Sequence, residues 1–196
     1  MSKTWKAFER DTGKTFSLAY YPGNDGEFRR TSAFAQSGGW GKGMAGGDLV
    51  ATKYGYGEEI FIDKSFPFSI ECKNWRQEGV KHFFSGLYSA ESVIFEWMDQ
   101  SITDAEKFDK MPLVVFRLFR QKSIAMLVAT DFAKLKELFG EPEFKYYFLR
   151  RYPAGDEENA KPNLLVFVLL KDFISWIDWE VYKFASRNFI RSVVKT

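Results

Sequence analysis

Residues that could carry out a hydrolysis lie along one predicted strand. The run from Phe68 to Lys73 alternates between apolar and polar side chains, which is typical of a half-buried β-strand. Its apolar side chains therefore point to one face, and Glu71 and Lys73 project side by side from the other. We expect that second face to be open to solvent, so that it presents a carboxylate and an amine together.

A second carboxylate precedes this strand. Asp48 opens another strand-like run, which ends at Thr52, so a neighbouring strand could bring Asp48 beside Glu71. These two carboxylates and the backbone carbonyl of Cys72, which lies between Glu71 and Lys73, would offer Mg²⁺ the oxygen ligands that it prefers. Such a metal polarises a phosphoryl oxygen and lowers the pKa of a bound water. Lys73 would orient that water or assist its deprotonation, and the sequence leaves both roles open.

The order of these residues resembles a known motif. Asp48, followed after a gap of hairpin length by Glu71-Cys72-Lys73, resembles the PD-(D/E)xK nuclease superfamily. A longer set of residues, within roughly the first two thirds of the chain, resembles the Holliday-junction-resolvase-like nucleases of phages and some archaea. That set comprises Arg29-Arg30-Thr31, Ser37-Gly38-Gly39, Gly47-Asp48-Leu49-Val50 and the run from Phe66 to Asn74. Gly47 stands where the superfamily motif has its proline, a departure that many members share.

The resemblance implies a fold, two further site residues and a substrate. The fold is α/β, a restriction-endonuclease-like core with a central mixed β-sheet flanked by helices. Glu9 matches the acidic residue that relatives carry on the first helix, where it completes the metal site, and Gln100 resembles a glutamine beside the active site. The implied activity is that of a Mg²⁺-dependent endonuclease, with Mn²⁺ as a substitute. The implied protein is a homodimeric Holliday junction resolvase that cuts branched, four-way DNA.

A Gly-rich, polar stretch from Pro22 to Gly47 leads into Asp48. We expect a mobile loop here, because such a stretch cannot bury much apolar area. The whole chain has a net charge of only +2, so any affinity for nucleic acid must come from a local patch. The candidates for contacts with DNA phosphates are Arg29, Arg30, Ser37 and Lys42. A solvated, charged loop is the alternative.

Length and composition bound the class of protein. A chain of 196 residues that is 45% hydrophobic suits one globular domain, with core motifs in 1–130 and an extension in 131–196. The single cysteine, Cys72, excludes an internal disulfide, and the single histidine, His82, argues against a zinc hydrolase. The N-terminus lacks an apolar signal core, and no apolar run reaches membrane-spanning length. We therefore expect an intracellular, cytoplasmic protein and, from the resemblance, one encoded by a phage in a bacterial host.

The elements that position these residues are predicted from periodicity and end signals. The predicted helices are Lys3–Asp11 with Gly13 as its stop, Ser89–Phe108, a helix capped by Asp131 and ended by Gly140, and a final helix capped by Asp172. The predicted strands are Asp48–Thr52, Ile60–Ile62, Phe68–Lys73, Leu113–Phe119, Ser123–Val128 and Leu164–Leu170.

Three functions stay open at this point. The first is the junction resolvase, and the second is a restriction or repair nuclease with the same site and another DNA substrate. The third is a non-catalytic DNA-binding protein on a nuclease-like fold. Comparison of substrates separates the first two, and the variants Asp48→Ala and Glu71→Ala separate both from the third.

Overall fold

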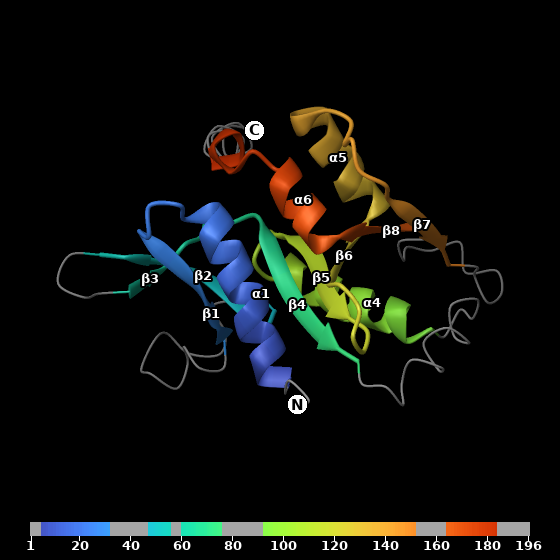
Figure 1. Ribbon diagram of the computed structural model, residues 1–196, viewed down its shortest axis with the longest axis horizontal. Coiled ribbons are helices and arrows are strands. Elements are labelled where there is room, and N and C mark those ends of the chain that lie inside the picture. The colour runs from blue at the N-terminus through green and yellow to red at the C-terminus, as the bar shows by residue number, and fades with distance from the viewer. Residues whose placement is uncertain (1–4, 32–46, 56–59, 76–91, 152–163, 184–196) are drawn as a thin grey trace.

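The computed structural model describes residues 5–31, 47–55, 60–75, 92–151 and 164–183, and it has helices packed on both faces of one β-sheet (Figure 1). The helices are α1 (Trp5–Tyr20), α4 (Val93–Glu106), α5 (Ala129–Phe139) and α6 (Leu170–Trp176). The strands are β1 (Gly26–Arg30), β2 (Leu49–Tyr54), β3 (Ile60–Ile62), β4 (Phe68–Asn74), β5 (Met111–Arg117), β6 (Ile124–Val128), β7 (Tyr147–Arg150) and β8 (Leu164–Leu169).

The sheet has eight strands in the order β1-β2-β4-β5-β6-β8-β7, with β3 paired to β2 beside this path. β4 and β5 run parallel, and α4 lies in the connection between them, as a parallel pair requires. The other pairs are antiparallel. The predicted α/β fold with a mixed central sheet flanked by helices is therefore confirmed. The six predicted strands are also confirmed, and their ends differ from the predicted ones by at most two residues.

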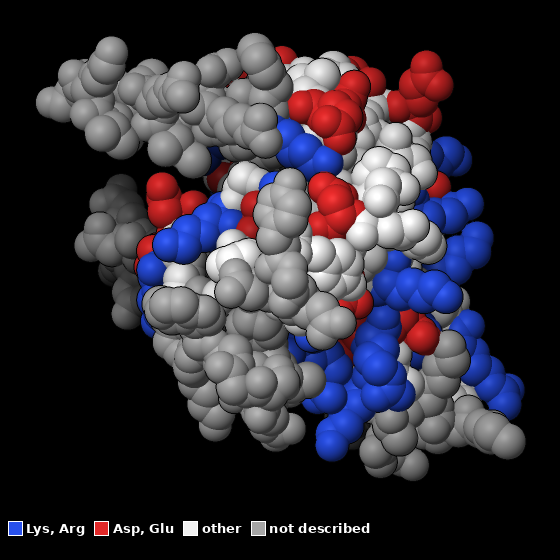
Figure 2. Space-filling model, turned by 90° about the vertical axis from the view of Figure 1, so that its left-hand side faces the viewer, with Lys and Arg blue, Asp and Glu red and all other residues white. Residues whose placement is uncertain are grey.

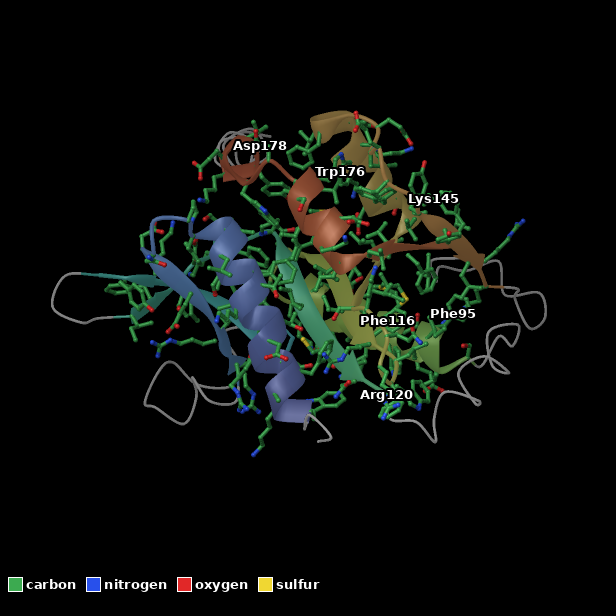
Figure 3. All side chains as sticks on the ribbon, viewed as in Figure 1. Phe95, Phe116, Arg120, Lys145, Trp176 and Asp178 are labelled. Atoms are coloured by element: carbon green, nitrogen blue, oxygen red, sulfur yellow. The ribbon has the colours of Figure 1, made fainter. Side chains whose placement is uncertain are left out.

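Each face of the sheet has its own apolar core. α1, α5 and α6 cover one face, where Phe8, Phe132 and Phe173 are buried against the strands. α4 covers the other face, and Phe95 of this helix lies in the same core as Phe116 of β5 (Figure 3). Of the helices described here, none is both long and apolar enough to span a membrane.

α1 is longer than predicted, because Gly13 lies inside the helix and does not end it. A Cβ atom at Gly13 would lie 3.2 Å from the carbonyl oxygen of Phe28, so glycine lets the helix approach β1 closely. Phe8 and Phe16, on the same side of the helix, are buried in the core. This packing outweighs the cost of about 1 kcal/mol that glycine carries within a helix. The prediction that Gly13 is a stop was wrong.

The expectation of a mobile loop from Pro22 to Gly47 was wrong for its first part. Residues 26–30 form β1, which pairs with β2 from Gly26 opposite Lys53 to Arg30 opposite Leu49. One aromatic side chain explains this strand, because the ring of Phe28 lies 4.6 Å from that of Phe66 and is buried. The composition of the whole stretch conceals this single apolar anchor. Residues 32–46 lie outside the described part of the chain.

Two of the predicted helix caps were wrong. α5 begins at Ala129, so Asp131 lies in its first turn, where the carboxylate accepts a hydrogen bond from Lys134 Nζ at 2.9 Å. α6 likewise begins at Leu170, and Asp172 lies in its first turn. Both carboxylates are still near the positive end of a helix dipole, where a negative charge is stabilising. The predicted end of α5 at Gly140 is confirmed, with a φ of 81°.

Candidate active site

Asp48 is held at the start of β2 by two contacts with the backbone of β4. Its N–H donates to the carbonyl of Ile70 at 2.7 Å, and its Oδ2 accepts a hydrogen bond from the N–H of Cys72 at 2.8 Å. Gly47 has a φ of 76°, and a Cβ atom there would lie 2.3 Å from the carbonyl oxygen of Ile70. Proline has a φ near −65°, so it could not replace Gly47 in this conformation. The departure from the superfamily motif therefore has a local cause.

Glu71 and Lys73 lie on the same face of β4, as their spacing predicts. Lys73 Nζ donates to Glu71 Oε1 at 2.6 Å and to Gln100 Oε1, on α4, at 3.1 Å. The expectation that this face is open to solvent was wrong, since Glu71 is only 5% exposed. The apolar side of α4 packs over the face, and the ion pair with Lys73 compensates the buried carboxylate. The structure thus brings Glu71, Lys73 and Gln100 together.

Glu9 lies on α1 and is 4% exposed. It is on the buried side of the helix, with Phe8 and Thr12. Its carboxylate forms an ion pair with Arg30 of β1. α1 and β1 therefore contribute an acidic and a basic side chain that pair with each other beside β2, and Glu9 is close enough to Asp48 for its charge to act on that carboxylate.

The acidic residues of the site affect one another. Burial, the charge of Glu71 and the charge of Glu9 raise the pKa of Asp48 to about 7, although the hydrogen bond from Cys72 acts in the opposite direction. Asp48 is therefore close enough to each of the other two carboxylates for their charges to repel it. The thiol of Cys72 is fully buried and its pKa is raised by that burial, so it is a structural residue and not a nucleophile.

The fold and this arrangement of acidic residues and lysine agree with a match to a known family. The family described as "Phage putative PDDEXK endonuclease" matches residues 6–173, a range that includes every residue of the site. The chain belongs to this family. Searches of curated proteins and of solved structures gave no match. The matched range extends past the first two thirds of the chain, so α5, β7 and β8 also lie within the length shared with PDDEXK endonucleases.

The residues of this PDDEXK site fit a divalent cation that keeps part of its water shell. Within the described ranges, no three His, Cys, Asp or Glu side chains are grouped as a complete metal site. Asp48 and Glu71 nevertheless offer carboxylate oxygens from adjacent strands, and a cation between them would relieve the repulsion that raises the pKa of Asp48. Mg²⁺ commonly binds through one or two carboxylates, with waters and substrate phosphate as the other ligands.

The predicted DNA contacts are placed differently from the expectation. Arg29 and Arg30 belong to β1 and not to a loop, and each pairs with a carboxylate, Arg29 with Glu27 and Arg30 with Glu9. Ser37 and Lys42, like the single histidine, lie outside the described residues.

Two residues beside the site of this PDDEXK family member were given no role from the sequence, although Thr31 belongs to the motif set that resembles the junction resolvases. Thr31 follows β1 and ties down the turn before β2, because its Oγ1 donates to the carbonyl of Gly47 at 2.8 Å. Arg117 ends β5 opposite Asn74, and its guanidinium lies 4.6 Å from the ring centroid of Phe8. No ion pair is formed by Arg117 with any residue in the described ranges. The available signal was a basic residue within the otherwise apolar run from Leu113 to Phe119.

Proposed function

We propose that this protein is a DNA endonuclease that depends on a divalent metal, with Asp48 and Glu71 as metal ligands. The observation that supports this is the fixed position of the Asp48 carboxylate. It is bound to the backbone of β4 at Cys72, the residue between Glu71 and Lys73. An acidic side chain from one strand is thereby joined to an acidic and a basic side chain of the next, which is the arrangement that the PDDEXK family match leads us to expect.

The reaction is hydrolysis of a phosphodiester. The oxygen of a water adds to phosphorus, one bridging P–O bond breaks, and the leaving oxygen gains a proton. When bound, Mg²⁺ or Mn²⁺ would polarise a phosphoryl oxygen and make a bound water more acidic. The backbone carbonyl of Cys72 is a further oxygen ligand that we assign to this metal. Glu9 would become another by exchanging its ion pair with Arg30 for the cation.

Lys73 would orient the attacking water and stabilise the charge that develops on the phosphate. A lysine ammonium has three N–H donors. Two of them are directed to Glu71 and Gln100, at 2.6 and 3.1 Å. The third is left for the water or for a phosphoryl oxygen. Gln100 is therefore assigned a positioning role, because it fixes the direction of the Lys73 amine.

Arg117 would contact a phosphoryl oxygen on the α1 side of the sheet. Its guanidinium lies over Phe8, the neighbour of Glu9 in α1. It extends from β5, whose last residue pairs with the last residue of β4. An arginine without a carboxylate partner in the described residues keeps its donors free for phosphate.

We further propose that the substrate is a four-way DNA junction and that the active form is a homodimer. The support is the resemblance of the motif residues to junction resolvases, together with the part that Thr31 of that motif has in holding Gly47. A two-fold symmetric dimer would present two related sites for paired cuts. The place of action would be the cytoplasm of a phage-infected bacterium. A restriction or repair nuclease with a linear substrate is the second candidate, and a non-catalytic DNA-binding protein is the third.

The test compares a labelled four-way junction with matched linear duplex, single-stranded and flap DNA, in Mg²⁺, in Mn²⁺ and in EDTA. Wild type and Glu71→Ala are assayed side by side. Paired nicks that are confined to the junction, require the metal and are absent in the variant would support the resolvase. Equal cutting of the other substrates would leave the nuclease and remove the resolvase. Equal metal-dependent cutting by Glu71→Ala would overturn the assignment of the site.

A further inference from the structure

A groove runs between α1 and β1, at the edge of the sheet. Its volume is about 770 Å³, and the residues that line it include Arg10, Lys14 and Leu18 of α1 and Phe28, Arg29 and Arg30 of β1. We call it the α1–β1 groove. Lys and Arg side chains gather on the lower right of the face that this end of the molecule presents in Figure 2.

The groove is basic. Four of the residues that line it are Arg or Lys, and Glu27 is the one acidic residue among them. Glu27 pairs with Arg29, and Arg30 pairs with Glu9, so Arg10 and Lys14 are the other two basic side chains of the groove. Arg10 and Lys14 are exposed, and neither forms an ion pair with the residues that the structure describes. An anionic partner would therefore find two uncompensated positive charges in this groove.

One end of the groove lies beside the candidate active site. Arg30 lines the groove and forms an ion pair with Glu9, and Leu49, which also lines it, directly follows Asp48. From that end the groove follows α1 past Arg10 and Lys14, which are one helical turn apart. The segment of α1 from Arg10 to Leu18 spans about 12 Å of helix.

The walls of the groove are fixed by direct contacts between the helix and the strand. Ser17 Oγ accepts a hydrogen bond from the N–H of Phe28 at 2.8 Å, and Gly13 allows α1 to approach the carbonyl of the same residue. The ring of Phe28 also packs on Phe16, with 5.5 Å between centroids. The spacing of the basic side chains of α1 from those of β1 is therefore set by packing.

We infer that the α1–β1 groove binds the sugar–phosphate backbone of the DNA on one side of the cleaved phosphodiester. This inference rests on the proposed function, since it takes the partner to be the DNA that the site cuts. A DNA strand carries one phosphate per 3.4 Å of duplex axis, so a groove about 12 Å long faces several phosphates in succession. Arg10 and Lys14 would each neutralise one of them and hold the DNA in register without reading its sequence.

The experiment measures binding and not cleavage, so that it reports on the groove alone. The double variant Arg10→Gln/Lys14→Gln is made in a Glu71→Gln background and titrated with fluorescent duplex and four-way DNA at several salt concentrations. We expect the Kd to rise about tenfold near physiological salt and the slope of log Kd against log salt to fall by about 2, because two phosphate contacts are lost. The control Lys134→Gln/Lys171→Gln removes the same charge from α5 and α6, and it should change neither quantity. Circular dichroism and a melting curve establish that α1 is intact in both proteins.

An unchanged Kd and salt slope in the groove variant would overturn the inference, and so would an equal loss in the control. If the groove instead binds an acidic protein segment, the groove variant would bind polyglutamate more weakly than its Glu71→Gln parent does, while the two proteins bind DNA equally. That result would also overturn the inference. The proposed function fails by a different result, the absence of metal-dependent cleavage by wild type. The salt slope of the groove variant would still decide the inference about the groove in that case.

Discussion

Asp48 Oδ2 accepts a hydrogen bond from the backbone N–H of Cys72 at 2.8 Å, so the side chain that directly precedes β2 takes the place of a backbone acceptor beside β4. The two strands pair directly at Leu49 and Ile70, the position next to this contact. A carboxylate is thereby fixed at the point where β2 leaves β4. The contact explains how a charged residue that burial disfavours can have a defined position, since its hydrogen bond is part of the sheet.

Replacing Asp48 by Asn should separate the structural role of this residue, the hydrogen bond with Cys72, from the chemical role of its charge. Asparagine can still accept the hydrogen bond from Cys72, but it removes the charge that Glu71 and Glu9 repel. In EDTA we expect Asp48→Asn to be more stable than wild type by about 1 kcal/mol of unfolding free energy, and so to unfold at a higher temperature. The variant should also lose cleavage and any stabilisation by Mg²⁺. Asp48→Ala leaves a buried N–H without its acceptor and should lower the stability by about 1–2 kcal/mol. Thermal unfolding with and without Mg²⁺ measures this, and an Asn variant less stable than the Ala variant would contradict it.

Gly47 should tolerate neither the proline of the superfamily motif nor alanine. A Cβ atom would meet the carbonyl of Ile70 at 2.3 Å, and the φ of 76° disfavours any residue with a side chain. We expect Gly47→Ala to lose about 3 kcal/mol of unfolding free energy and most of the activity. Gly140→Ala is the matched control, because its φ is 81° but nothing lies within 4 Å of the added atom. Urea unfolding should give a cost of about 1 kcal/mol there, and equal costs at the two glycines would refute the steric argument.

The sequence predicts the central strands and the pairing of Glu71 with Lys73, because a period of two is a local property that tertiary contacts do not alter. It does not reveal what covers their face. Alternation of polar and apolar residues is the same for a strand side exposed to solvent and for one whose polar groups are buried under a helix. The alternation therefore predicts an open face for Glu71, whereas in the structure α4 covers that face and Glu71 is buried.

Other differences arise where packing between distant segments outweighs local preference. Gly13 has the propensity of a helix stop, but its missing side chain is what lets α1 pack against the carbonyl of Phe28. Phe28 is likewise one apolar residue in a polar stretch, and it forms a strand because the rings of Phe16 and Phe66 surround it. Such contacts join residues far apart in the chain and leave no periodic signal.

Arg117 should be required for cleavage and not for folding. Arg117→Met keeps a long apolar side chain over Phe8 and removes the guanidinium that we assign to a phosphoryl oxygen. We expect the single-turnover rate constant of cleavage to fall by about 10²-fold with little change in melting temperature, and Arg117→Lys to restore part of that rate. Arg120→Met is the matched control, since Arg120 also lies over an aromatic ring, that of Phe119 at 5.0 Å, and is exposed. Single-turnover cleavage measures the rates, and a wild-type rate in Arg117→Met would remove this residue from the site.

Lys110 should make the stability of the fold depend on pH in the alkaline range. Its amine lies 5.8 Å from the ring centroid of Phe66, and burial lowers its pKa from 10.5 to about 8, although the charge of Asp63 acts in the opposite direction. Between these two values the unfolded chain keeps a proton that the folded chain has released, so stability should rise from pH 8 toward pH 10. The slope is at most about 1.4 kcal/mol per pH unit.

Lys110→Met should abolish this rise and should stabilise the protein at neutral pH, because no charge is then buried. Lys107→Met is the control, since the side chain of Lys107 is 58% exposed and should leave the slope unchanged. Urea unfolding at a series of pH values below 10, before the tyrosines of the unfolded chain ionise, measures both slopes. A Lys110→Met protein that keeps the wild-type slope would show that another group is responsible for it.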